Sequence, residues 1–166
     1  MKLVEAVPAD SGFLFDIFIQ GAMKNSYHPN MASKKDKTKA YVDGLIFFKR
    51  DSLTGGIVQP MVAFDKEQKI GILITESRED QTTYLTAISV LDQFQNMGYG
   101  KQLFDKFLSD TTLSKTLIAE CRGGAKVFSQ MLLKKGFKLT KEHNGVGSYE
   151  LNRSKSNFVP KFKWNF

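Results

Sequence analysis

A glycine-containing segment between a predicted strand and a predicted helix constrains the fold more than any other feature of the sequence. Residues 90–100 read Val-Leu-Asp-Gln-Phe-Gln-Asn-Met-Gly-Tyr-Gly. The alternating side chains of residues 82–90 predict a strand, and the apolar stripe within residues 103–108 predicts a helix. A strand that leads through such a loop into a helix indicates an α/β fold.

This loop has the features of a phosphate-binding site. The first N–H groups of a helix lack intrahelical partners and carry the positive end of the helix dipole, so they attract anions. Gly98 and Gly100 have no Cβ atom, which lets the backbone approach a phosphate closely. The loop lacks the third glycine of a dinucleotide fingerprint and the Gly-Lys-Ser/Thr ending of a P-loop. The alternative interpretation is that Gly98 and Gly100 only form a turn and bind no phosphate.

The remaining elements follow from apolar periodicity and turn residues. The sequence predicts strands at residues 3–7, 60–64, 69–75, 82–90, 116–121 and 147–151. It predicts helices within residues 10–21, 33–51, 98–108 and 127–136, the last one ending at a glycine. This order contains a crossover of strand, helix and strand around the glycine loop.

Length and composition predict one domain and exclude several other classes of protein. The chain has 166 residues, of which 42% are apolar and 25% charged, as in ordinary soluble domains. We assign residues 1–153 to the domain and residues 154–166 to a terminal appendage. No apolar run approaches the roughly 20 residues that cross a bilayer, and the N-terminus lacks a signal-peptide pattern. We therefore expect a cytoplasmic protein that does not bind a membrane.

The sequence contains a single cysteine, Cys121, which excludes an internal disulfide. We interpret Cys121 as a small buried residue.

The loop resembles the signature of the GNAT N-acetyltransferase superfamily, Gln/Arg-x-x-Gly-x-Gly/Ala, and the order of elements resembles that family as well. The resemblance implies a mixed, mostly antiparallel sheet that is splayed at the cofactor site and flanked by about four helices. It implies acetyl-CoA as co-substrate and no metal. The backbone at Ile88 and Val90 would bind pantetheine, and Lys101 could add a phosphate contact. The pyrophosphate would be held by Gln95, Asn96, Met97, Gly98, Tyr99 and Gly100.

The catalytic residues are less well defined, because two family positions hold other residues here. Leu132 occupies the position of the family's tyrosine acid, and Ala125 that of its asparagine. A carboxylate can accept the proton of the attacking amine, so Glu76 and Glu120 are the candidate bases. Tyr149 and Tyr99 are candidate phenols. Tyr84 occupies a strand position that is often acidic in the family, and His28 lies in the loop that usually shapes the acceptor pocket.

Three functions fit the sequence. The first is acetyl transfer to the primary amine of a small molecule or peptide by direct attack. The second is transfer to an RNA-linked amine such as aminoacyl-tRNA, which the net charge of +7 and the lysines and aromatics of residues 154–166 would suit. The third is a non-catalytic acyl-CoA-binding module. We expect the aromatic appendage to pack on its own domain or across a homodimer rather than to stack on nucleic-acid bases.

Overall fold

The computed structural model describes residues 1–153, in which three helices follow the first strand and a helix lies on each side of the fifth strand. The strands are β1 (Lys2–Glu5), β2 (Ile57–Asp65), β3 (Gln68–Ser77), β4 (Thr82–Val90), β5 (Thr116–Arg122), β6 (Lys138–His143) and β7 (Val146–Asn152). The helices are α1 (Ser11–Met23), α2 (Asn30–Ser33), α3 (Lys35–Phe47), α4 (Tyr99–Asp110) and α5 (Lys126–Lys134).

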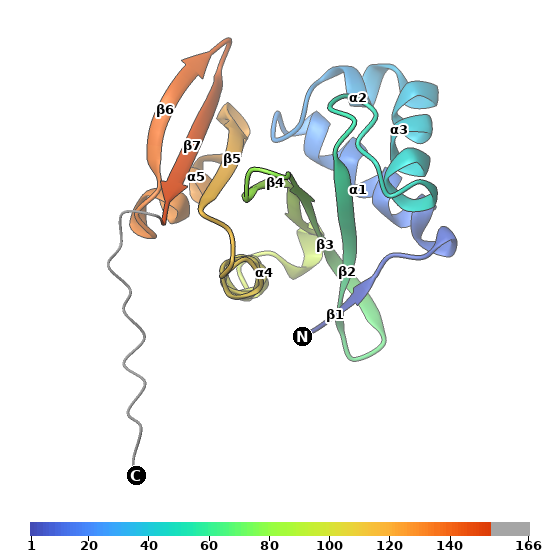
Figure 1. Cartoon of the computed structure of the whole chain (residues 1–166). Helices are drawn as coiled ribbons and strands as arrows, with labels where there is room; N and C mark the ends of the chain where they lie inside the picture. The colour runs from blue at the N-terminus through green and yellow to red at the C-terminus, as the bar shows by residue number, and fades with distance from the viewer. Residues whose placement is uncertain (154–166) are drawn as a thin grey trace.

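The strands form one sheet in the order β1-β2-β3-β4-β5-β7-β6. The central pair, β4 and β5, is parallel, and the other neighbouring strands are antiparallel. Pairing between β4 and β5 covers only residues 82–85 of β4, although β4 continues to Val90. The sheet therefore opens into two halves beyond that point, and Figure 1 shows this divergence between β4 and β5.

One apolar cluster lies on each face of the sheet. On one face, Leu14 and Phe18 of α1 and Leu45 of α3 pack against Val62 and Ile72 of the sheet. On the other face, residues of α4 and α5, among them Leu103, Phe104, Phe107 and Leu132, pack against β3, β4, β5 and β7. Because burial of one such side chain contributes about 1.5–3 kcal/mol, these clusters stabilise the packing of the helices on the sheet. The helices α1 to α3 lie over the β1–β4 half only (Figure 1).

The predicted α/β architecture, with its mixed and mostly antiparallel sheet, is confirmed, and four of the helices are longer than one turn. Two details of the sequence interpretation are wrong. The sequence favours a loop over residues 24–32 and a helix from residue 33, whereas residues 30–33 form the short helix α2. Strand β6 was not predicted, because its six residues are exposed and it pairs only with β7 at the edge of the sheet.

The structure was also searched for membrane-spanning helices and for groups of metal-binding side chains. Between residues 1 and 153, no helix is long and apolar enough to cross a membrane. In the same range, no group of three or more histidine, cysteine or acidic residues could hold a metal ion. The predicted packing of residues 154–166 lies outside the described residues.

Candidate functional site

A groove of about 580 Å³ lies where the sheet opens. Residues 85–90 of β4 form one wall. Glu120 and Arg122 of β5, together with Phe128 and Met131 of α5, form the other wall. Its volume is within the range of small-molecule sites, and it combines apolar walls with a few polar groups, as such sites do.

A β-bulge lies at the closed end of this groove. Ile74 of β3 pairs with Ala87, whereas the next residue, Thr75, pairs with Leu85, so Thr86 is an extra residue in β4. Beyond Leu85, β4 has no partner on the β5 side. The backbone of Ile88 and Val90 therefore faces a groove rather than a strand. Among residues 1–153, the Thr86 hydroxyl is the one buried side-chain polar atom without a hydrogen-bond partner.

The other end of the groove is the N-terminus of α4. Gly98 precedes the helix with φ 84°, a left-handed conformation that glycine adopts without strain. No side chain caps the helix, and its first turn contains no acidic residue. Gln95, Asn96 and Gly100 line the groove here. An uncapped helix N-terminus at the end of a groove is suited to bind the phosphates of a ligand that extends along it.

The side chains around this loop have structural roles. The Gln95 amide donates hydrogen bonds to the Val90 carbonyl and to Asp92 Oδ1, both at 3.0 Å. Asp92 in turn forms an ion pair with Lys24 of the segment that follows α1. Gln95 thus holds the shape of the loop as well as lining the groove.

Three other residues predicted to bind cofactor direct their side chains elsewhere. The Tyr99 hydroxyl donates at 2.7 Å to Asp65, the last residue of β2. Lys101 Nζ lies 2.6 Å from Asp105 Oδ2, one helical turn along α4, on an exposed face. The side chain of Met97 is exposed and does not line the groove. For Met97 and Tyr99, only the backbone N–H groups remain available to a phosphate, and the predicted Lys101 contact has no support in the geometry.

The segment after α1 covers the middle of the groove. Tyr27 packs against Gly21, where a Cβ atom would lie 2.2 Å from the ring. Its hydroxyl donates to the Ile88 carbonyl at 3.3 Å, and burial raises the pKa of this phenol far above its usual value. The same segment contacts the opposite wall, because Gly124 N–H donates to the Asn25 carbonyl at 3.1 Å.

A second pocket, of about 620 Å³, adjoins the groove and shares His28, Glu120, Arg122 and Val146 with it. It lies over the face of β5, β7 and β6 that neither apolar cluster includes. Tyr84 also lines this second pocket. Two pockets that meet at one carboxylate can hold two reactants next to each other, and Glu120 is that carboxylate.

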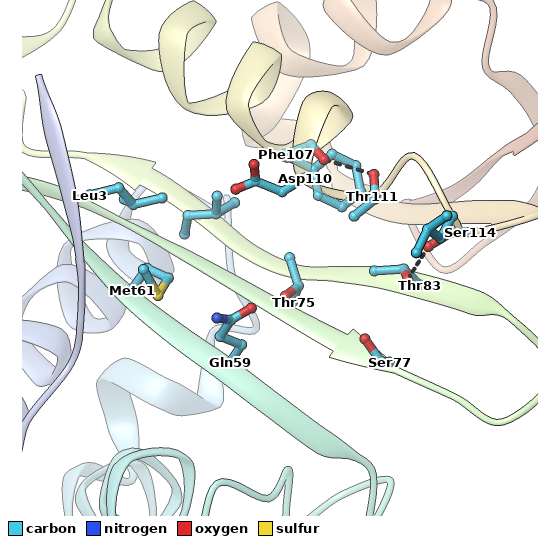
Figure 2. Close-up of a pocket in the computed structure, with 12 residues that line it drawn as sticks. Leu3, Gln59, Met61, Thr75, Ser77, Thr83, Phe107, Asp110, Thr111 and Ser114 are labelled. Carbon is cyan, nitrogen blue, oxygen red and sulfur yellow. Dashed lines mark hydrogen bonds between the residues drawn. The ribbon is translucent and has the colours of Figure 1, made fainter. Parts of the chain in front are cut away.

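A third and smaller cavity, of about 140 Å³, lies between β1–β4 and the end of α4. Figure 2 shows its lining, in which the hydroxyls of Thr83 and Ser114 bond to each other at 2.7 Å. Asp110 is the one titratable group among its lining residues. This cavity shares no lining residue with the groove, so we assign it no part in the site.

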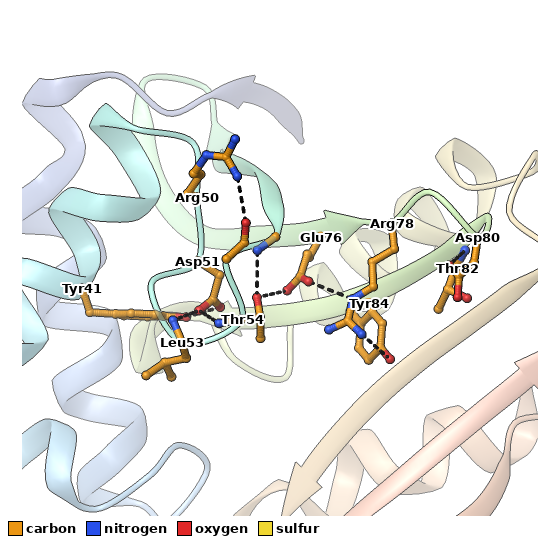
Figure 3. A network of polar contacts seen from close by, with 12 residues as sticks. Tyr41, Arg50, Asp51, Leu53, Thr54, Glu76, Arg78, Asp80, Thr82 and Tyr84 are labelled. Atoms are coloured by element: carbon orange, nitrogen blue, oxygen red, sulfur yellow. Dashed lines mark hydrogen bonds and ion pairs between the residues drawn. The ribbon is translucent and has the colours of Figure 1, made fainter.

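Glu76 and Glu120, the two candidate bases, lie in different surroundings. The side chain of Glu120 is exposed and lines both pockets. Glu76 is 2% exposed and lines neither. Figure 3 shows its carboxylate between Thr54 Oγ1, which donates at 2.9 Å, and Arg78 Nε, which donates at 3.0 Å. These bonds make Glu76 part of the framework rather than a group that reaches a substrate.

Two other candidate residues, Tyr149 and Cys121, lie in an apolar cluster and do not line the groove. Tyr149 pairs with Ala119 and packs in the cluster on the α4 and α5 side of the sheet. Cys121 belongs to the same cluster, and its burial raises the pKa of the thiol from 9.0 to about 12, with a smaller contribution from the charge of Glu120. Such a thiol remains protonated and unreactive near neutral pH. The expectation that Cys121 is a buried small residue is confirmed.

No family model and no curated relative matches the sequence. The structure is nevertheless similar to those of several acetyltransferases. The PaiA N-acetyltransferase from Thermoplasma acidophilum, in complex with coenzyme A, has a TM-score of 0.68 and 12% identity over 91% of this chain and 98% of its own. A GNAT-family acetyltransferase from Staphylococcus aureus has a TM-score of 0.62 and 14% identity over 92% and 98%.

A third similar structure is RimL, a ribosomal L7/L12 α-N-protein acetyltransferase in complex with coenzyme A. Its TM-score is 0.63, with 16% identity over 90% of this chain and 92% of its own. Each of the three similarities covers 90% or more of this chain. The chain therefore has the fold of the GNAT acetyltransferases.

Proposed function

We propose that this protein transfers an acetyl group from acetyl-CoA to a primary amine. One observation carries the proposal: a groove runs from the uncapped N-terminus of α4 to the last pair of β4 and β5, and there it meets a second pocket. An extended donor with phosphates at one end and a reactive group at the other fits this groove. The second pocket leaves room for the acceptor.

The donor's orientation follows from the two ends of the groove. The N–H groups of residues 95–100 would bind the pyrophosphate, because they form the electropositive end. The backbone of Ile88 and Val90 would bind pantetheine along the unpaired edge of β4. The thioester then lies near Leu85 and Thr86, beside Glu120.

Glu120 is the base that we assign to the reaction. A carboxylate at the meeting point of the pockets can take the proton that the amine loses when its nitrogen attacks the thioester carbonyl carbon. The attack is direct, because the buried and protonated Cys121 does not supply a nucleophile. We propose no catalytic role at the substrate for Glu76 or Tyr149, because neither lines the groove or the second pocket.

The acceptor is the amine of a small molecule or a peptide. RimL, one of the similar structures, acetylates a protein, and its acceptor chemistry is the kind we propose here. The second pocket is lined by residues of both charges, among them Glu120, Glu150, Arg122 and Lys141, which suits a polar amine. The net charge of +7 also fits an RNA-linked amine, and the experiment therefore includes one.

Calorimetry with acetyl-CoA and a thiol-release assay test the proposal. The assay uses three acceptors: spermidine, a short peptide with a free α-amino group, and an aminoacyl-tRNA. We expect acetyl-CoA to bind and one of these amines to accelerate release of CoA. Binding without turnover on this panel would instead favour a non-catalytic acyl-CoA-binding module, and absence of binding would exclude both functions.

A further inference from the structure

One of the five tyrosines of the chain has a hydroxyl in an unusual arrangement. Tyr27 donates its proton to the Ile88 carbonyl, Tyr41 to Asp51 and Tyr99 to Asp65. Tyr149 packs in the apolar cluster on the α4 and α5 side. Tyr84 differs from them all, because its oxygen accepts a hydrogen bond from Arg78 Nη1 at 3.1 Å.

A guanidinium group has donors only, so the Arg78 contact leaves the phenolic proton of Tyr84 free. Within residues 1–153, that proton has no acceptor. The guanidinium carbon also lies 3.9 Å from the centroid of the Tyr84 ring, stacked on one face (Figure 3). These two contacts with one cation fix the orientation of the Tyr84 ring and of its oxygen.

Arg78 is fixed in this position by a chain of hydrogen bonds. Its Nε donates to the buried Glu76 at 3.0 Å. The other oxygen of Glu76 accepts from Thr54 at 2.9 Å, and the Thr54 hydroxyl accepts from Gly56 N–H at 3.1 Å. A buried carboxylate that is hydrogen-bonded on both oxygens holds its guanidinium partner in one orientation. The alignment of Tyr84 is therefore set before any substrate binds.

Tyr84 lies close to the proposed reaction centre. It directly precedes Leu85, the last residue of β4 that pairs with β5 and a residue that lines the groove. Tyr84 itself lines the second pocket, together with Glu120 and His28. Both of these residues also line the groove. The free proton of Tyr84 is thus available to the second pocket, which meets the groove at Glu120 and His28.

We propose that Tyr84 protonates the CoA thiolate as it leaves, and that Arg78 and Glu76 act as positioning residues. This inference rests on the proposed acetyl transfer. The amine nitrogen bonds to the acetyl carbon and gives a proton to Glu120. The carbon–sulfur bond breaks, sulfur keeps the electron pair, and it takes the Tyr84 proton. The phenolate beside Arg78 regains a proton from water after CoA leaves, and Glu120 returns its proton to water.

The substitution Tyr84→Phe tests the inference, because it retains the stacked ring and removes only the hydroxyl. We expect kcat to fall on the order of 10²–10⁴-fold, which is the usual contribution of general acid–base catalysis. Affinity for acetyl-CoA and the melting temperature should stay unchanged. The acceptor is spermidine or the free-amine peptide, whichever the wild type acetylates.

Three further variants distinguish protonation of the thiolate by Tyr84 from a structural effect of the substitution. Tyr149→Phe makes the same change on the other face of the sheet and should leave kcat unaltered. Arg78→Gln and Glu76→Gln should lower kcat without raising the KM of the amine, since they disturb only the alignment of Tyr84. Full kcat in Tyr84→Phe, or a rise in amine KM at constant kcat, would overturn the inference while the proposed function stands. Absence of turnover by the wild type would overturn both.

Discussion

Leu85 of β4 pairs with Ala119 of β5, and this is the last pair that joins the two strands. The residue after Ala119 is Glu120, so the proposed base is attached where the sheet opens. Because β4 remains paired with β3 as far as Val90, the wall of the groove is a strand held on one side and open on the other. The dimensions of the site are therefore set by strand pairing rather than by loops, and a site on rigid elements is well suited to substitution experiments.

Gly100→Leu should abolish or strongly weaken binding of acetyl-CoA without unfolding the protein. Gly100 lines the groove, has no positive φ, and has no heavy atom within 4 Å of the position that a Cβ would occupy. A leucine there therefore fits the free protein and favours the helix by up to about 1 kcal/mol, yet its side chain occupies the space of a phosphate. Calorimetry with acetyl-CoA, together with the melting temperature, measures both effects.

Gly98 provides the contrast to Gly100. Its φ of 84° disfavours any residue with a Cβ atom, although there is space around it. Gly98→Ala should therefore lower the melting temperature and weaken binding together. If Gly100→Leu bound acetyl-CoA as tightly as the wild type, the phosphate site would have to lie elsewhere.

Thr86→Val and Thr83→Val should change stability in different directions, although both replace a hydroxyl on β4. The buried Thr86 hydroxyl has no partner, so its removal should leave the free energy of unfolding unchanged or raise it. The Thr83 hydroxyl bonds to Ser114 at 2.7 Å, and its loss should cost about 1 kcal/mol. Urea unfolding of the two variants distinguishes these outcomes. An equal loss in both would mean that Thr86 has an unrecognised partner.

The parts of the fold that depend on local pattern could be predicted from the sequence. The alternation of residues 82–90 and the two glycines after it correctly predicted β4, the loop and α4. Strand β6 could not be predicted in this way, because an exposed edge strand lacks the apolar alternation that marks a half-buried one. Only its turn to β7 was visible, at Asn144 and Gly145, which adopt positive φ values of 50° and 71°.

The site was harder to predict because its geometry depends on distant residues. Glu76 and Glu120 are equally plausible bases in the sequence, since both are glutamates near strand ends. In the structure, Thr54 donates a hydrogen bond to the Glu76 carboxylate from the loop before β2, 22 residues away in the sequence. This contact helps to hold Glu76 outside the groove. No local pattern encodes that contact. The Arg78–Tyr84 stack likewise requires the antiparallel pairing of β3 and β4.

Cys121 should resist alkylation in the folded protein. Burial raises the pKa of the thiol from 9.0 to about 12, so at pH 8 almost none of it is the reactive thiolate. Iodoacetamide at pH 8 should therefore label Cys121 slowly in buffer and rapidly in denaturant. Between pH 9 and pH 12 the unfolded thiol loses its proton while the folded one retains it, so this group should lower stability progressively as the pH rises through that window. Rapid labelling of the native protein would contradict the burial.

Glu120→Gln should reduce turnover and leave the protein otherwise intact. The side chain is exposed and, among the described residues, forms no salt bridge, so the melting temperature should not change. The phosphate end of the groove is also untouched, so affinity for acetyl-CoA should remain. If Glu120 takes the proton of the amine, kcat/KM for the acceptor should fall on the order of 10²–10⁴-fold.

The pH dependence of the Glu120→Gln variant separates a base from a binding group. A glutamine cannot accept the proton, so the variant should regain rate as the pH rises and the free amine form of the acceptor becomes abundant. A variant that had only lost a contact to the acceptor would keep the wild-type pH profile and show a higher KM for the amine. Glu150→Gln is the matched control, because Glu150 lines the second pocket but not the groove. Its kcat should stay near that of the wild type, and an equal loss of kcat in both variants would assign the effect to the charge of the pocket instead of to proton transfer.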